Sequence, residues 1–114
     1  MEDCIFCKII NQEIPSTKVY EDDLVYAFKD ADPQAPVHFL VVPKVHIPSA
    51  NDLKEEDQAL LGHILLVISR LAKDLGIAEA GYRIVNNCGE DGGQTVGHLH
   101  YHILGGRSLQ WPPG

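Results

Sequence analysis

Positive charge is scarce in this 114-residue chain. Only nine Lys and Arg oppose 16 Asp and Glu, and the formal net charge is −7. Nucleic-acid polymers and anionic membrane surfaces are bound mainly through Lys and Arg, so this balance argues against both as partners. A single phosphate group remains an acceptable ligand, because a few backbone N–H groups and histidines can hold it locally.

Long apolar runs and cysteines are also few. The longest apolar run, residues 64–68, is far shorter than the ~20 residues that cross a bilayer. The N-terminus has no basic region followed by an apolar one, so we expect no secretory signal and a cytoplasmic location. Three cysteines, an odd number in a reducing compartment, argue against a disulfide framework.

The remaining composition is 45% hydrophobic and fits one domain of ordinary size, residues 1–114. Periodicity predicts an α+β fold, in which a mainly antiparallel sheet of about five strands carries one long helix on one face. A short N-terminal helix precedes the sheet. We expect the helices at residues 4–11 and 54–75, and the strands at 17–22, 24–30, 37–42, 81–87 and 98–104.

The long helix is predicted from a one-sided apolar stripe of period 3.6. We expect Asn51 or Asp52 to cap its start, Gly76 to end it, and His63, which is off the stripe, to lie on the surface. The stripe comprises Leu60, Leu61, Ile64, Leu65, Ile68, Leu71, Ala72 and Leu75. In the short helix, the inward-facing residues are expected to be Ile5, Phe6, Ile9 and Ile10.

The most unusual stretch is 97-GHLHYHILGG-106, where His98, His100 and His102 occupy alternate positions. Alternate side chains of a strand share a face, so the three imidazoles would point one way. The outer two would be ~13 Å apart, which argues against one metal ion bound by all three. Because neutral Nε2 is a nucleophile and a protonated ring donates to phosphate oxygens, the row suits a phosphoryl or nucleotidyl centre. The glycine-rich loop 89–95 would let its backbone approach a phosphate, or would be a plain hairpin loop.

Cys4 and Cys7 form a C-x-x-C motif with three open interpretations: a redox pair, half of a zinc site, or two core cysteines. A redox pair normally lies at the mouth of a βαβ unit, and no such unit is predicted. Zinc needs two further nitrogen or sulfur ligands, for which His46 and His98 are candidates.

The stretch 98–104 fits the pattern His-φ-His-φ-His-φ-φ at every position and resembles the histidine triad (HIT) family of nucleotide hydrolases and transferases. Residues 28–46, 86–98 and 105–114 are similar to the Hint branch of that family, the histidine triad nucleotide-binding proteins. The resemblance therefore covers nearly the whole chain.

The resemblance implies hydrolysis of purine nucleoside phosphoramidates through a covalent nucleotidyl-histidine on His100. It further implies that the carbonyl of His98 orients His100, that His102 binds the α-phosphate, and that His38 supports the nucleophile. Thr95, where many Hint proteins have Ser, would donate to the leaving group. The other implied nucleotide contacts are Asp30 to the ribose, Phe6, Ile9, Phe28 and Ala31 to the purine, and Asn87, Gly93 and Gln94 to the phosphate and leaving group.

Zinc-containing relatives, including galactose-1-phosphate uridylyltransferases, bind the metal at the matching Cys2His2 positions. The resemblance thus implies a bacterial-type member with a structural Zn²⁺ held by Cys4, Cys7, His46 and His98. It also implies a homodimer, in which Trp111 reaches the neighbouring site. Three alternatives remain open: a dinucleoside polyphosphate hydrolase, a zinc hydrolase that uses metal-bound water, and a nucleotide-binding regulatory module with little turnover.

Overall fold

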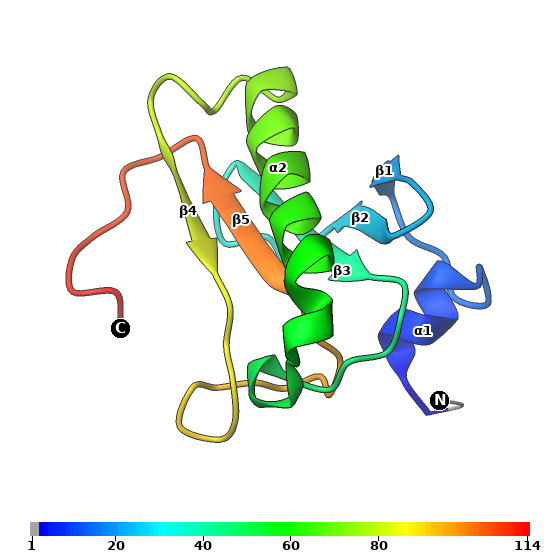
Figure 1. The fold of residues 1–114 in the computed structure, drawn as a ribbon. Coiled ribbons are helices and arrows are strands. Elements are labelled where there is room, and N and C mark those ends of the chain that lie inside the picture. The colour runs from blue at the N-terminus through cyan, green and yellow to red at the C-terminus, as the bar shows by residue number, and fades with distance from the viewer. Residues whose placement is uncertain (1–2) are drawn as a thin grey trace.

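The computed structural model describes residues 3–114. Its sheet has the strand order β1-β2-β3-β5-β4, and each of these neighbouring pairs is antiparallel. This architecture confirms the predicted α+β fold with a five-stranded sheet, one long helix and a short N-terminal helix (Figure 1). The elements are α1 (Ile5–Ile10), β1 (Lys18–Glu21), β2 (Val25–Lys29), β3 (Val37–Pro43), the 3₁₀ turns η1 (Ala50–Asp52) and η2 (Glu55–Asp57), α2 (Gln58–Asp74), β4 (Tyr82–Val85) and β5 (Tyr101–Gly105).

The two faces of the sheet are covered by different helices. Figure 1 shows α2 lying across one face, where Ile64 and Ile68 pack in one cluster with Ile103 of β5. On the other face, Phe6 and Ile9 of α1 pack against alternate residues of β2 and β3. The central strand β3 is buried from both sides, which agrees with its almost wholly apolar sequence.

The long helix begins later than expected. Residues 50–52 form a separate 3₁₀ turn, whose first N–H groups are capped by Ser49 rather than by Asn51 or Asp52. Leu53 then returns to an extended conformation, and the Asp57 carboxylate accepts the N–H of Lys54 at 2.9 Å. The C-terminus is as predicted, because Gly76 adopts a positive φ of 76° there.

The buried stripe of α2 is also shifted from the prediction. Val67, outside the predicted stripe, is 1% exposed, whereas Leu65 and Leu75, inside it, are 50% and 41% exposed. The true core face follows the spacing i, i+3, i+4, i+7, i+8, and the predicted set mixed it with an adjacent apolar face. In α1 the same error occurs at Ile5, which is 45% exposed. The residues of α2 that are buried are Ile64, Val67, Ile68, Leu71 and Ala72.

The last strand is shorter than the predicted 98–104. β5 begins at Tyr101, so His98 and His100 precede the strand and only His102 lies on it. Pairing with β3 stops at the Val41–Tyr101 register, and Leu99 instead donates its N–H to the carbonyl of Ile47 at 2.6 Å. The loop that enters β5 is therefore longer than the expected hairpin loop. None of the helices in residues 3–114 has the length and apolar character needed to cross a membrane.

His63 is not a free surface residue, because it joins α2 to the β1–β2 turn. Its Nε2 lies 2.6 Å from Oδ2 of Asp22, to which Tyr20 donates its hydroxyl at 2.8 Å. Oδ1 of Asp22 accepts the backbone N–H groups of Leu24 and Val25 at 2.8 and 2.9 Å. Partial burial alone would raise the pKa of Asp22, but these hydrogen bonds outweigh it and hold the pKa well below its ordinary value.

Replacing Asp22 with Asn should lower the free energy of unfolding by about 1–3 kcal/mol at neutral pH, because a carboxylate that accepts several hydrogen bonds is lost. A lowered folded-state pKa contributes stability that is fully present above the unfolded value, about 3.9, and is lost as the pH falls through the folded value. The difference between wild type and Asp22→Asn should therefore persist at pH 5 and shrink below about pH 4. Urea unfolding across that range measures it, with exposed Asp23→Asn as the control. An undiminished difference at pH 3 would contradict the assignment.

Candidate functional site

His100 is buried and held in one orientation. Its Nδ1 lies 2.7 Å from the backbone carbonyl oxygen of His98. A carbonyl only accepts, so Nδ1–H is the donor, and in the neutral ring Nε2 keeps its free lone pair. The backbone of His100 is fixed as well, because Asn86 donates its side-chain amide to the His100 carbonyl at 2.9 Å. The result is a rigid imidazole with an available nitrogen.

The aromatic ring of Phe6 packs against His100 from α1. The two ring centroids are 5.0 Å apart at an interplanar angle of 85°, and Phe28 contacts Phe6 at 5.5 Å. Phe6, Phe28 and Ile9 are at most 7% exposed and share one apolar cluster. Of the four residues expected to line a purine, these three thus gather beside the histidines, whereas Ala31 is exposed beyond β2.

A second pair of histidines adjoins His100. The Gln34 backbone N–H donates to Nδ1 of His38 at 3.0 Å, so neutral His38 carries its proton on Nε2. That Nε2 lies 3.0 Å from Nδ1 of His102 and 3.3 Å from Oδ2 of Asp30. When His38 donates to His102, the neutral ring of His102 must carry its own proton on Nε2. His38 therefore contacts His102, and its influence on His100 passes through that ring.

Burial favours the neutral form of two of the histidine rings, those of His102 and His98. It lowers the pKa of His102, and the neighbouring His100 and His38 lower it further, while the carboxylate of Asp30 works in the opposite direction. Burial likewise lowers the pKa of His98. Both rings are therefore more readily neutral than free histidine. The ring centroids of His100 and His102 are 5.1 Å apart. The unprotonated Nε2 of His100 therefore lies on a ring next to the one that carries the N–H of His102.

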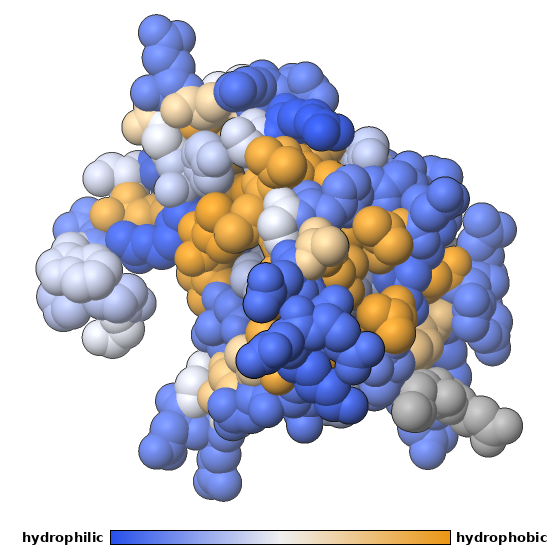
Figure 2. Space-filling model, in the orientation of Figure 1, coloured by the Kyte–Doolittle hydropathy of each residue, from blue (hydrophilic) through white to orange (hydrophobic). Residues whose placement is uncertain are grey.

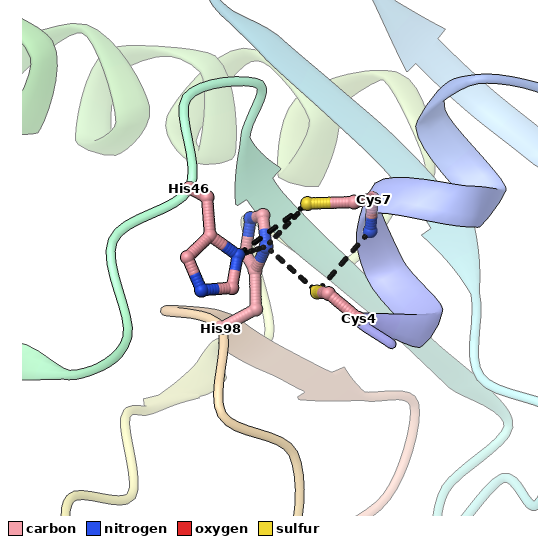
Figure 3. Close-up of side chains that lie close together, drawn as sticks. All are labelled: Cys4, Cys7, His46 and His98. Carbon is pink, nitrogen blue, oxygen red and sulfur yellow. Dashed lines mark hydrogen bonds between the residues drawn. The ribbon is translucent and has the colours of Figure 1, made fainter. Parts of the chain in front are cut away.

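The predicted metal ligands converge from three parts of the chain (Figure 3). Nδ1 of His98 lies 3.3 Å from Sγ of Cys4 and 3.6 Å from Sγ of Cys7. Nδ1 of His46 lies 3.4 Å from Sγ of Cys7 and 3.1 Å from Nδ1 of His98. We call these four residues the Cys2His2 cluster; their ligand atoms all lie within 4.8 Å of one another.

The Cys2His2 cluster fits the dimensions of tetrahedral zinc. Bonds of about 2.3 Å to sulfur and about 2.05 Å to nitrogen place S and N atoms about 3.6 Å apart and two N atoms about 3.3 Å apart. The tautomer fits too, because Nε2 of His98 lies 2.9 Å from the carbonyl oxygen of Pro43 and must donate to it. That leaves the lone pair of Nδ1 directed into the cluster. Burial raises the pKa of the Cys7 thiol, and the neighbouring Cys4 side chain raises it further.

The remaining predicted site residues lie on the loop between β4 and β5. Gln94 ties this loop down by donating to the carbonyls of Pro48 and Val96 at 2.8 and 2.9 Å, and Gly93 has a φ of 78°. Thr95 lines a cleft of about 480 Å³ with Cys4 and His46. Asn87, at the start of the same loop, lines a separate groove beside β4 together with Arg83 and Trp111.

Sequence reasoning missed two contributors to the site, Asn86 and the backbone of Gln34. Each fixes a histidine by one hydrogen bond, Asn86 to His100 and Gln34 to His38. Asn86 directly follows β4, whose pairing of Val85 with His102 brings it to the start of β5. Strand register is set by tertiary packing, so no local pattern identifies such a residue.

Known proteins closely resemble this chain. A HIT-like protein of Synechococcus elongatus, described as uncharacterized, is 59% identical over 113 residues, which cover 99% of this chain and 98% of that protein. The structure of a HIT family hydrolase from Legionella pneumophila is 50% identical with a TM-score of 0.97, covering 98% of this chain and 100% of the other. That of a histidine triad nucleotide-binding protein from Candida albicans is 35% identical with a TM-score of 0.82, covering 96% and 83%.

The family model described as the HIT domain matches residues 11–109. That span includes His38, His46 and all three histidines of the alternating row, while Cys4 and Cys7 precede it. Together with the full-length relatives, this match assigns the chain to the HIT family.

Proposed function

We propose that this protein is a nucleotide hydrolase of the Hint branch that cleaves purine nucleoside phosphoramidates through a covalent intermediate on His100. One observation carries the proposal: a buried imidazole with a bare Nε2 adjoins a second ring that presents an N–H. The first suits attack on phosphorus, and the second suits a phosphoryl oxygen. The hydrolase from Legionella pneumophila and the nucleotide-binding protein from Candida albicans are consistent with this chemistry.

In the first step, Nε2 of His100 attacks the α-phosphorus, the P–N bond breaks, and the amine leaves with a proton supplied from Thr95 or water. The attacking ring gains positive charge, which strengthens its Nδ1–H bond to the carbonyl of His98. His102 donates Nε2–H to a non-bridging oxygen, with His38 holding its tautomer. In the second step, water attacks phosphorus and the P–Nε2 bond breaks. The proton that this water loses replaces the one given to the amine, and His100 is regenerated with the nucleoside monophosphate as product.

The nucleoside end of the substrate would lie toward α1 and β2. We assign the ribose hydroxyls to Asp30, whose Oδ1 accepts only the N–H of Asp32, at 2.8 Å, within the described chain. Phe6, Ile9 and Phe28 are packed against one another, so a purine would contact their outer edges, beside Ala31. Asn87, Gly93 and Gln94 would act at the phosphate and leaving group, with Gln94 fixing the loop.

We further propose that Cys4, Cys7, His46 and His98 hold a structural Zn²⁺, which makes this a zinc-containing Hint protein. When bound, zinc would supply a cross-link between α1, the segment after β3 and the residues before β5. Four protein ligands leave no open position, so the protein's histidines carry the chemistry rather than a metal-bound water. Thiols kept reduced for a metal fit the cytoplasmic location expected from the sequence.

The test is AMP release from adenosine 5′-phosphoramidate, compared with diadenosine polyphosphates at equal concentration. We expect faster turnover of the phosphoramidate and, in rapidly quenched samples, an acid-labile adenylyl group on His100. Preference for the diadenosine substrate would assign the protein to dinucleoside polyphosphate hydrolysis instead. AMP binding without turnover of either substrate would indicate a nucleotide-binding regulatory module.

The protein should form a homodimer through the face that carries α2. Figure 2 shows hydrophobic residues gathered on this face, and Leu65, Leu66 and Ile84 there are 50%, 60% and 42% exposed. An exposed apolar patch of this kind favours association. Sedimentation should give a dimer of about 25 kDa, twice the 12.6 kDa chain. Leu66→Lys should shift it to monomer, whereas Glu55→Lys, outside the patch, should not. A wild-type monomer at about 100 µM would limit any dimer to a Kd weaker than that concentration and overturn the proposal.

A further inference from the structure

The thiols of Cys4 and Cys7 are arranged for reaction with each other. Both belong to the Cys2His2 cluster, whose ligand atoms lie within 4.8 Å of one another, and both are only half-buried. The backbone N–H of Cys7 donates to Sγ of Cys4 at 3.3 Å, which stabilises negative charge on that sulfur. The two cysteines are three positions apart, so a disulfide between them would close a loop of one turn of chain, as in other C-x-x-C motifs.

One thiol of the pair is reachable from solvent. Cys4 lines the cleft of about 480 Å³ together with His46 and Thr95, whereas Cys7 is not among its lining residues. A small oxidant can therefore approach Cys4 first, with Cys7 behind it in the cluster. The third thiol, Cys88, is half-buried to a similar degree but lies in the loop after β4, outside the cluster. Burial alone thus does not distinguish the three cysteines; position does.

We propose that Cys4 and Cys7 form a reversible oxidation site that reacts with hydrogen peroxide and releases the metal. The Cys4 thiolate attacks one peroxide oxygen, the O–O bond breaks, and the leaving oxygen departs as water after taking up a proton. The Cys7 thiolate then attacks the resulting sulfenic sulfur, the S–O bond breaks, and a second water leaves. Two electrons pass from the two sulfurs to the peroxide, and a disulfide replaces two metal ligands.

The consequence reaches the histidine row through His98. This residue places its Nδ1 in the cluster and its backbone carbonyl on Nδ1 of His100, 2.7 Å away. Phe6, between the two cysteines in sequence, packs on both His98 and His100. A disulfide has no S–H to donate and draws both sulfurs away from the imidazoles, so the support of His100 is loosened. This effect on turnover rests on the proposed function, whereas the thiol chemistry does not.

The experiment treats the zinc-loaded wild-type protein with hydrogen peroxide and follows thiols, mass and free zinc. We expect loss of two of the three thiols, a mass decrease of about 2 Da from the two lost hydrogens relative to the reduced chain, and one zinc released per disulfide. Peptide mapping should place the disulfide at Cys4 and Cys7. A dithiol should restore the thiols and, with added zinc, the metal. AMP release should fall about tenfold on oxidation and return on reduction.

Three variants locate the reaction. In Cys7→Ser, a sulfenic acid should accumulate at Cys4 and be trapped by dimedone; in Cys4→Ser, Cys7 should react at least about tenfold more slowly. Cys88→Ser should behave as wild type. Equal oxidation of all three cysteines, preferential oxidation of Cys88, or a disulfide that leaves zinc bound would overturn the proposal. Because mapping uses the wild-type chain, poor folding of a variant leaves the test intact.

Discussion

His100→Ala should lower kcat/KM for adenosine 5′-phosphoramidate by at least about 10³-fold. Alanine removes Nε2, the only atom proposed to bond phosphorus. The other two histidines of the row cannot replace it, because Nδ1 of His98 is directed to the Cys2His2 cluster and Nε2 of His102 carries a proton. The loss should appear in kcat, since substrate contacts of the nucleoside remain. The acid-labile adenylyl adduct should disappear with the activity.

His63→Ala is the matched control, because His63 lies on α2 and bonds Asp22 on the helix-covered side. It should keep the activity of wild type at temperatures where both are folded. A melting curve of His100→Ala separates lost chemistry from lost folding, since His100 is only 4% exposed. Added imidazole should restore part of the AMP release by acting as a diffusible nucleophile. Full activity in His100→Ala without imidazole would exclude His100 as the nucleophile.

Local patterns were sufficient where one residue type determines the backbone or the burial. The almost wholly apolar stretch 37–42 predicted the strand β3, and Gly76 predicted the end of α2. The strands expected at 17–22 and 24–30 are too close in the chain for a parallel connection, and β1 and β2 are indeed antiparallel. The alternate spacing of the histidines predicted that their rings point one way from a strand, but only His102 lies on a regular strand.

Long-range register could not be derived in the same way. Pairing of β3 with β5 sets His38 opposite Leu104, so its ring reaches His102 on the same face. That pairing depends on β5 inserting between β3 and β4. These two strands are separated by 38 residues (44–81), and their own sequences do not show which strand lies beside them. The choice between Leu65 and Val67 as a core residue of α2 failed for the same reason, because the sheet beneath decides which side of the helix is buried.

His98 shows why a row of equal residues does not imply equal roles. Its ring is fully buried, with Nε2 donating to Pro43 and Nδ1 directed at Cys4 and Cys7. Only its backbone carbonyl faces His100. His98 thereby joins the Cys2His2 cluster to the proposed nucleophile. We therefore expect a bound metal to affect catalysis by fixing the position of His100, not by taking part in the reaction.

Removing zinc should therefore lower stability far more than catalysis. A metal that binds only the folded chain at about 10³ times its Kd adds about 4 kcal/mol to the free energy of unfolding. For a chain of this size that corresponds to a fall in Tm of roughly 15 °C on chelation. The Cys2His2 cluster joins α1 to the segments that carry His46 and His98, so hydrogen exchange should increase first in α1.

Turnover below the lowered Tm should fall less than about tenfold, because in the reduced, zinc-free chain the thiols of Cys4 and Cys7 still hydrogen-bond the two imidazoles. The adenylyl adduct on His100 should still form.

Calorimetry and quenched-flow assays with and without chelator measure the effects on stability and on turnover. The double variant Cys4→Ser/Cys7→Ser, which lacks both thiols, should have a Tm that no longer responds to zinc. An unchanged Tm would contradict the structural metal, and loss of the adduct with the metal would favour a metal-bound water. We expect neither of these two contradicting results, because four protein ligands leave no position for a metal-bound water and His98 orients His100 only through its backbone carbonyl.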